Sequence, residues 1–336
     1  MIIWIILIIL SLLFIIKFDF ISQKINLYDF PDKKRKFQKI KVSLLGGPLI
    51  AVFFNLYIFL NINHLTDFES FPNLLLLESY REVGLFFIIS NSLFLIGLYD
   101  DKYDLSPKDK IFLIILFISI FVYFDQDVKI YELRSSILNK TFFLQGSSFI
   151  FTVTCFFVLI VALNMFDGIN GQSFLNFIAI FLFLISYQIF QKISFFIIFS
   201  LIIFSYLNFK NKIYLGDSGV YFCGFLTSYF IIKTYNYNYL IYVEEVIIIL
   251  IIPIIDMLRL FIIRIFNGKN PFLPDRNHIH HIIQNKFGNK AIYIIFILLF
   301  IPLLLLILKF NHLYIILIQV SLYFLSTILI LKNNEI

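Results

Sequence analysis

The chain has 336 residues, of which 60% are hydrophobic and only 14% are charged, and its formal net charge is +6. So few polar residues could not cover the surface of a soluble domain, and the mean hydropathy of +0.93 is typical of a polytopic membrane protein. The composition therefore excludes a soluble protein with one core. Lys and Arg form no stretch interleaved with stacking aromatic residues, so nucleic acid is not expected as a partner. Cys155 and Cys223 both lie in apolar segments and give no disulfide framework and no metal-binding spacing.

Apolar blocks separated by polar breaks predict an all-α polytopic integral membrane protein with about eleven transmembrane helices. The first block has no basic residue before it and no small-residue cleavage site after it, which favours a retained helix over a signal peptide. No internal repeat or linker is visible, so residues 1–336 are expected to form one transmembrane domain with cytoplasmic catalytic loops. The predicted spans are 1–16, 44–62, 83–99, 111–124, 148–164, 173–187, 193–208, 219–235, 243–264, 291–308 and 313–331.

The distribution of Lys and Arg predicts which connections face the cytoplasm. If the connection after the first span is inside, the inside segments hold 19 of the 27 basic residues and the outside segments hold 7, with Arg259 inside a span. Because cytoplasmic loops are enriched in Lys and Arg, the N-terminus is expected outside and the C-terminus in the cytoplasm. The longest outside connection, residues 125–147, contains the alternating stretch VKIYELRSS, which predicts a small hairpin on the membrane.

Four polar islands all fall on the cytoplasmic side of this topology, and the outside connections contain nothing comparable in sequence. Acids, glycines, histidines and lysines that converge on one face of a bundle are what a site for a charged soluble substrate and a membrane-held partner requires. The islands are GLYDDKYDLSPKDK (97–110), ALNMFDGINGQ (162–172), NKIYLGDSGV (211–220) and NGKNPFLPDRNHIHH (267–281).

The first island carries three aspartates at helical spacing. On a helix that continues the third span, Asp100, Asp101 and Asp104 would share one stripe. Three carboxylates on one stripe favour a bound divalent cation, which removes their repulsion. Lys110 adds a cation that could hold a phosphate. The alternatives are a solvated helix end and a lysine that only anchors the boundary of the membrane.

The second island places Asn164 and Asp167 at helical spacing and then breaks the chain with Gly168 and Gly171. Glycines there would let backbone amides approach an anionic oxygen. A tight turn between two helices is the alternative, and taken alone this island favours the turn.

The third island places Asp217 between Gly216 and Gly219 at the start of a span. A single aspartate before a helix is either an N-cap or a ligand for Mg²⁺, which one or two carboxylates and substrate phosphates commonly hold.

The fourth island gathers histidines in an extended stretch that Pro271 and Pro274 begin. Zinc is conceivable there, but cysteine is absent and the nearby acids favour Mg²⁺ chemistry. We expect the island to bind phosphate or sugar oxygens; the alternative is a solvated interfacial loop. The residues concerned are Arg276, His278, His280 and His281.

Asp256 and Arg264 lie at or near membrane depth in the ninth span. Ionisable groups there are costly, so they are functional candidates or a structural ion pair. Eight residues is a long reach for direct pairing, and the sequence leaves this question open.

The islands, taken in this order, resemble the polyprenyl-phosphate N-acetylhexosamine-1-phosphate transferases of glycosyltransferase family 4. The resemblance covers most of the chain. The histidine motif is similar to that of the branch that uses UDP-N-acetylglucosamine or related aminosugars, rather than the muramoyl-pentapeptide branch. The motifs that carry it are LGG (45–47), DDKYDLSPKDK, NMFDG, LGDSG, PIID (253–256), Arg264 and NPFLPDRNHIHH.

The chain departs from the family pattern at several positions. Val161 replaces the first Asn of the second island, Asn170 replaces its second Asp and Gln172 replaces its Leu. Val220 stands where Ser is common, and Phe37 lies near the place of an expected His. The family role of the acid at position 170 therefore cannot be assigned to this chain.

The resemblance implies that an N-acetylaminosugar 1-phosphate passes from a UDP-sugar to undecaprenyl phosphate, that UMP is released, and that a lipid-linked surface polysaccharide begins. It implies Mg²⁺, with Mn²⁺ as an alternative, and a bacterial inner membrane location with the active site facing the cytoplasm. Asp217 and Asp101 are expected to hold the metal. Asp100 is expected to deprotonate or orient the lipid phosphate, with support from Asp167. The expected substrate-binding residues are Lys110, Asn164, Arg264, Arg276, His278, His280 and His281.

Other functions compete with this one. A secondary transporter would carry its ionisable residues near the middle of the bilayer in repeated broken helices, which this sequence does not show. A noncatalytic polyprenyl-lipid binding protein or scramblase would explain the membrane spans, and the changed second island keeps it open. Within the enzyme class, phospho-N-acetylmuramoyl-pentapeptide transferase is the alternative. The expected partners are the UDP-aminosugar, undecaprenyl phosphate and membrane lipid, with a homodimer as one option for assembly.

Overall fold

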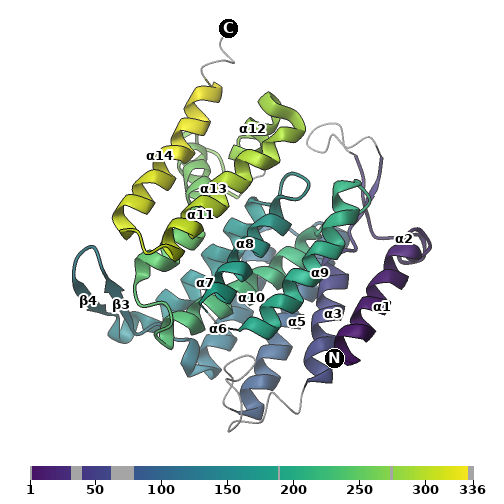
Figure 1. Cartoon of the computed structure of the whole chain (residues 1–336), viewed down its shortest axis with the longest axis horizontal. Coiled ribbons are helices and arrows are strands. Elements are labelled where there is room, and N and C mark those ends of the chain that lie inside the picture. Colours follow the sequence, from purple (N-terminus) through teal and green to yellow (C-terminus); the bar gives the residue numbers. More distant parts are fainter. Residues whose placement is uncertain (1, 32–39, 62–78, 188–189, 273–274, 332–336) are drawn as a thin grey trace.

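The structure is a computed structural model that describes residues 2–31, 40–61, 79–187, 190–272 and 275–331 (Figure 1). It is an all-α membrane protein with two small β-ribbons. The helices are α1 (Ile2–Ile16), α2 (Phe18–Ile25), α3 (Gly46–Leu60), α5 (Tyr80–Tyr103), α6 (Pro107–Phe124), α7 (Ser148–Met165), α8 (Gln172–Ser186), α9 (Gln191–Phe209), α10 (Gly216–Asn236), α11 (Val243–Phe266), α12 (Ile279–Phe287), α13 (Ala291–Ile307) and α14 (His312–Leu331). The strands are β1 (Tyr28–Asp29), β2 (Val42–Ser43), β3 (Glu132–Ser135) and β4 (Lys140–Phe143).

A helix occupies each of the eleven apolar segments predicted from the sequence. Among the described residues, five stretches are long and apolar enough to cross a membrane on their own, or six if α1 and α2, which meet at a bend of 74°, count as one. Helices α3, α8 and α14 are apolar but shorter. Helix α12, within the connection between α11 and α13, was not predicted, because it is only nine residues long.

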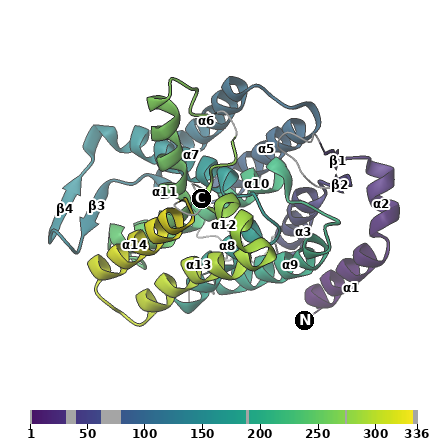
Figure 2. The ribbon, with the colours of Figure 1, turned by 90° about the horizontal axis from the view of Figure 1, so that it is seen from above.

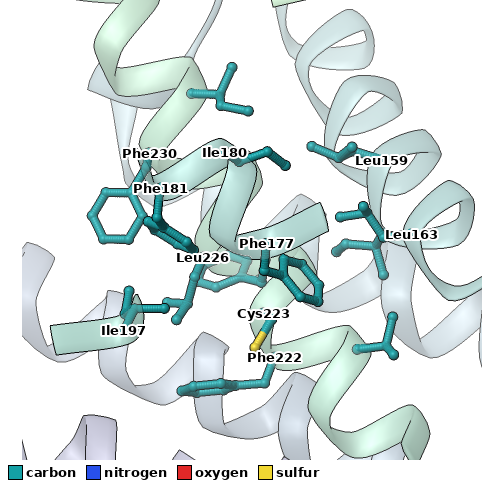
Figure 3. Packing of buried hydrophobic residues seen from close by; sticks show 14 of the residues in the cluster. Leu159, Leu163, Phe177, Ile180, Phe181, Ile197, Phe222, Cys223, Leu226 and Phe230 are labelled. Carbon is teal, nitrogen blue, oxygen red and sulfur yellow. The ribbon is translucent and has the colours of Figure 1, made fainter. Parts of the chain in front are cut away.

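Helix α10 is the central helix of the bundle (Figures 1 and 2). It is buried from Ser218 to Tyr235, and it packs against α3, α5, α7 and α8. Figure 3 shows Phe222, Leu226 and Phe230 of α10 among aromatic and aliphatic side chains from α7, α8 and α9. In a membrane this packing stabilises the bundle by dispersion, because lipid tails are as apolar as the side chains.

Glycines allow the first turn of α10 to touch two other helices. A Cβ on Gly47 would lie 2.2 Å from the backbone nitrogen of Gly219, and a Cβ on Gly97 would lie 2.4 Å from Cα of Ser218. The Gly47 amide also donates to the carbonyl of Leu215 at 2.8 Å. These backbone contacts fix the start of α10 between α3 and the last turns of α5.

At the other end of α10, buried charges and a hairpin close the bundle. Lys233 is fully buried, and its Nζ lies 3.8 Å from an oxygen of Asp125 and 3.6 Å from an oxygen of Asp127. The predicted hairpin is confirmed as the antiparallel pair β3–β4, which projects beyond the helices (Figure 1). The Arg134 amide donates to the Tyr235 hydroxyl at 2.8 Å, so this hairpin is fixed to the end of α10.

The two glycines of α5 give a matched test of the close approach. We expect Gly97→Ala to lower the free energy of unfolding by about 1–3 kcal/mol or more, because its methyl group would meet backbone that cannot move aside. Gly84→Ala adds the same methyl group where nothing lies within 4 Å, and it should be neutral or stabilising by up to about 1 kcal/mol. Thermal unfolding of the two variants in detergent measures the difference, and equal stability would contradict the proposed contact.

Candidate active site

A cavity of about 1040 Å³ opens at the end of the bundle where α5 and α7 end and α10 begins. Ten of the eleven site residues predicted from the sequence line it, and Arg264 is the exception. The four islands, which span residues 97 to 281, therefore meet in one place. The ten residues are Asp100, Asp101, Lys110, Asn164, Asp167, Asp217, Arg276, His278, His280 and His281.

The turn between α5 and α6 brings Lys110 back to Asp100. Helix α5 ends at Tyr103, Asp104 adopts a left-handed conformation, and the Ser106 hydroxyl caps α6 by accepting from the Asp109 amide at 3.3 Å. The prediction that Asp104 continues the helical stripe of Asp100 is therefore wrong, because the helix stops one residue earlier. The sharp turn is what places a basic residue of α6 beside the acids of α5.

Asp100 is buried and has three partners. One oxygen accepts from the Leu105 amide at 2.9 Å, and the other lies 2.7 Å from Nζ of Lys110 and 3.3 Å from the Tyr221 hydroxyl. Tyr221 was missed by the sequence analysis, although it follows Asp217 by one helical turn and so shares its face.

Asp101 binds the N-terminus of α10. Its oxygens accept from the Asp217 amide at 2.7 Å, from the Ser218 amide at 3.1 Å and from the Ser218 hydroxyl at 2.7 Å. A carboxylate at this position satisfies amides that have no partner inside the helix and complements the positive end of the helix dipole. Its assignment as a metal ligand stays a prediction; the contacts in the structure give it the role of holding α10.

Asp217 lines the cavity together with Asp100 and Asp101. Its side chain is 31% exposed, and one oxygen lies 3.8 Å from Nζ of Lys110. The Asp100 carboxylate is within hydrogen-bonding reach. Two ionised carboxylates this close would repel each other, and a divalent cation would relieve that repulsion.

The second island forms a turn that is hydrogen-bonded to Asn208 and Asn211. The Gly171 amide, at a φ of +84°, donates to Oδ1 of Asn208 at 2.6 Å, and Asn170 donates to the side-chain oxygen of Asn211. The Ser173 hydroxyl donates to Asp167. Burial raises the pKa of Asp167 to about 6, although this hydrogen bond acts in the opposite direction. The tight turn that the sequence favoured is therefore present, and it also lines the cavity.

Asp256 anchors the histidine island. One of its oxygens lies 2.7 Å from Nδ1 of His278, and the other accepts from the Ile279 amide at 3.0 Å, from the Tyr323 hydroxyl at 2.8 Å and from Arg259 at 3.0 Å. Asp256, His278 and His280 offer ligand atoms within 4.8 Å of one another and could hold a metal ion. Both oxygens of Asp256 already have partners, so a metal there would have to displace them.

Arg264 pairs with Asp275 at 2.8 Å and also donates to the carbonyl of Pro271. Its side chain is 4% exposed, and these two contacts fix the start of the histidine island. The question of its pairing is thereby answered, since its partner is Asp275 and the partners of Asp256 are His278 and Arg259. Its predicted contact with substrate stays a prediction. Pro274 and Phe37 lie outside the described residues.

This geometry defines a membrane protein that gathers carboxylates, imidazoles and cations around one cavity at the end of a helical bundle. Residues 83–235 match glycosyl transferase family 4. The undecaprenyl-phosphate alpha-N-acetylglucosaminyl 1-phosphate transferase of Yersinia pestis is 26% identical over 288 residues, which are 81% of this chain and 74% of that protein. The corresponding enzyme of Escherichia coli (strain K12) is 25% identical over 278 residues, which are 79% of this chain and 71% of that protein.

A third relative, the probable undecaprenyl-phosphate N-acetylglucosaminyl 1-phosphate transferase of Bacillus subtilis (strain 168), is 32% identical over 207 residues, which are 59% of this chain and 56% of that protein. The match to glycosyl transferase family 4 and the names of these relatives indicate a sugar-1-phosphate transferase enzyme. The resemblance carried by the four islands is confirmed.

The contacts predict different outcomes for two neighbouring acids. We expect Asp101→Asn to lower the free energy of unfolding by about 1–3 kcal/mol, because its amide group would oppose the amides of α10. Asp217→Asn should leave stability unchanged or raise it, because it removes one of two adjacent carboxylates. Thermal unfolding in detergent compares them, and equal losses would contradict the role given to Asp101.

Proposed function

We propose that this enzyme transfers an N-acetylaminosugar 1-phosphate from a UDP-aminosugar to undecaprenyl phosphate and releases UMP. The observation that carries the proposal is the convergence of ten predicted site residues on one cavity. The names of the relatives support the lipid acceptor and the N-acetylglucosaminyl 1-phosphate group. UDP-N-acetylglucosamine or a related deoxy aminosugar is the proposed donor.

In the proposed reaction an oxygen of the lipid phosphate attacks the phosphorus that bears the sugar, and the bond from that phosphorus to the oxygen of UMP breaks. The glycosidic C–O bond stays intact, so the anomeric configuration is retained. Because two anions must meet, the protein contributes mainly position and charge. Asp100, held by Lys110 and Tyr221, orients or deprotonates the lipid phosphate, and Asp167 supports it.

The remaining cations and imidazoles bind the donor. Arg276, His278, His280 and His281 line the same cavity as the acids, and Asn164 lines it together with the second island. Asp217, with Asp101 as the second predicted ligand and Asp100 beside it, would hold Mg²⁺ or Mn²⁺. When bound, this ion supplies electrostatic stabilisation of charge on the phosphate oxygens.

We further propose that all eleven segments cross the bacterial inner membrane, with the N-terminus outside and the cavity facing the cytoplasm. The lining of the cavity supports this topology. Its residues come from the connections after the first, third, fifth, seventh and ninth spans, together with the adjoining helix ends. A second cavity, of about 690 Å³, is lined by residues from the other set of connections and the adjoining helix ends, among them Ser136, Tyr187, Tyr239 and His312. The excess of Lys and Arg on the first set supports the cytoplasmic assignment.

Release of UMP by purified protein tests the function. With undecaprenyl phosphate, Mg²⁺ and a panel of UDP-aminosugars, we expect release that requires both the lipid phosphate and the divalent ion. Asp217→Asn should lower the rate by about 100-fold or more, because the proposed ligand loses its charge. Asp109→Asn is the control, since this exposed acid lies outside the lining of the cavity. Chelation with EDTA should abolish release, and Mg²⁺ or Mn²⁺ should restore it.

No release with any sugar, from protein shown to be folded, would overturn the transferase proposal. A polyprenyl-lipid binding protein or scramblase would then remain. Release with a muramoyl-pentapeptide donor alone would place the enzyme in the other branch of the family.

The raised pKa of Asp167 predicts an acidic limb in the pH profile. With a pKa of about 6, this carboxyl is mostly ionised at pH 8 and becomes protonated as the pH falls through 6. If the ionised form supports the reaction, the rate should fall with a midpoint near pH 6. Asp167→Asn should lower the rate at pH 8 by about 10- to 100-fold and remove this limb.

The stability of the same variant is the control. A buried acid with a raised pKa favours the folded state below its unfolded pKa, and that contribution is lost as the pH rises through the folded pKa. Asp167→Asn should therefore be at least as stable as the wild type at pH 8. A variant that loses activity only because it unfolds would contradict the proposed role.

A further inference from the structure

Gln172, the first residue of α8, is completely buried beneath the histidine island. Its Nε2 lies 3.2 Å from Nδ1 of His280, and its Oε1 has no hydrogen-bond partner among the described residues. An amide nitrogen can only donate, so Nδ1 of His280 must accept. The leucine that is usual at this position of the family motif could not make this contact.

The contact determines where His280 carries its proton. A neutral imidazole whose Nδ1 accepts a hydrogen bond is protonated on Nε2. Nε2 of His280 lies directly against Gly168, where an added Cβ would be only 1.8 Å away, and both residues line the cavity. His280 therefore presents an N–H group at the wall of the cavity.

The neighbouring imidazole, that of His278, makes the opposite kind of hydrogen bond through its Nδ1. Nδ1 of His278 faces the Asp256 carboxylate at 2.7 Å, and a carboxylate only accepts, so this nitrogen donates. The two rings are stacked with centroids 5.3 Å apart, and Phe166 packs edge-on against His280. Packing thus fixes the plane of the His280 ring, and Gln172 fixes its proton.

We propose that Gln172 is a positioning residue that holds His280 as the Nε2–H tautomer, so that His280 donates a hydrogen bond to an oxygen of the bound nucleotide sugar. This inference rests on the proposed function for the identity of the ligand. A diphosphate oxygen and a sugar hydroxyl share the required acceptor chemistry. Binding of UDP and of UDP-N-acetylglucosamine, measured separately, distinguishes these two sources.

The tautomer of His280 can be measured by NMR without enzymatic turnover. In ¹⁵N-histidine-labelled protein in nanodiscs, the His280 signals, assigned with His280→Gln, should show a protonated Nε2 and an unprotonated Nδ1. Gln172→Glu should move the proton to Nδ1, because a carboxylate can only accept. Gln172→Leu should give a mixture. A wild-type His280 protonated on Nδ1 would mean that the amide of Gln172 faces the other way, and it would overturn the proposal.

Calorimetry tests the consequence for binding. We expect Gln172→Leu to weaken UDP-N-acetylglucosamine binding by about 2- to 10-fold, the range for one neutral hydrogen bond. If a diphosphate oxygen is the acceptor, UDP binding weakens equally; if a sugar hydroxyl is, UDP binding is unchanged. Gln319→Leu is the matched control, since Gln319 is 2% exposed and donates to the Ile248 carbonyl, with its Oε1 likewise unpartnered. This control should change neither the tautomer nor the affinity.

Each result bears on a different claim. Loss of the tautomer in Gln172→Leu with unchanged affinity for both ligands would overturn the donor role of His280. Weakened binding without UMP release in the wild type would uphold the inference and overturn the transferase function. Because the wild-type spectrum alone reads the tautomer, a Gln172 variant that fails to fold does not prevent the test.

Discussion

The hydrogen bonds from the first turn of α10 to Asp101 are the constraint on which the site depends. They join the end of α5 to the start of the central helix, at the place where Gly47 and Gly97 allow backbone to touch backbone. Asp217 is the second residue of α10 and Tyr221 follows one turn later, so their positions beside Asp100 follow from this junction. A shift of α10 by one residue would separate Asp217 of α10 from Asp100 of α5.

The acids of the first island have separate tasks, which explains how so many charges are tolerated at the edge of a membrane. A buried carboxylate is costly unless it is paired or accepts hydrogen bonds. Asp101 accepts hydrogen bonds from helix amides, and Asp100 is paired with Lys110 and accepts from an amide and a hydroxyl. Asp217 lies close to both, with Nζ of Lys110 at 3.8 Å and the Asp100 carboxylate within hydrogen-bonding reach. The carboxylates that line the cavity are therefore close enough together for one cation to interact with more than one of them.

The sequence could predict the helices and most of the lining of the cavity, because both depend on local patterns. Apolar blocks located every long helix among the described residues. Partner choice could not be predicted, because it depends on contacts between residues far apart in the chain. Asp256 pairs with His278, 22 positions away, rather than with Arg264, and Gln172 meets His280 across 108 positions. The end of α5 before Asp104 also escaped prediction, because a left-handed residue other than glycine leaves little trace in the sequence.

Where the second island departs from the family pattern, its polar replacements make hydrogen bonds of their own. Asn170 donates to the side-chain oxygen of Asn211, which an aspartate could not do. Asn211 has a φ of +56°, a conformation that asparagine tolerates better than most residues. Gln172 makes a hydrogen bond to a catalytic-site imidazole that leucine would leave unpaired. The two polar replacements, Asn170 and Gln172, therefore each have a partner among the residues that line the cavity. The altered turn thus keeps its hydrogen bonds and leaves Asp167 in the lining of the cavity together with Asp100 and Asp217.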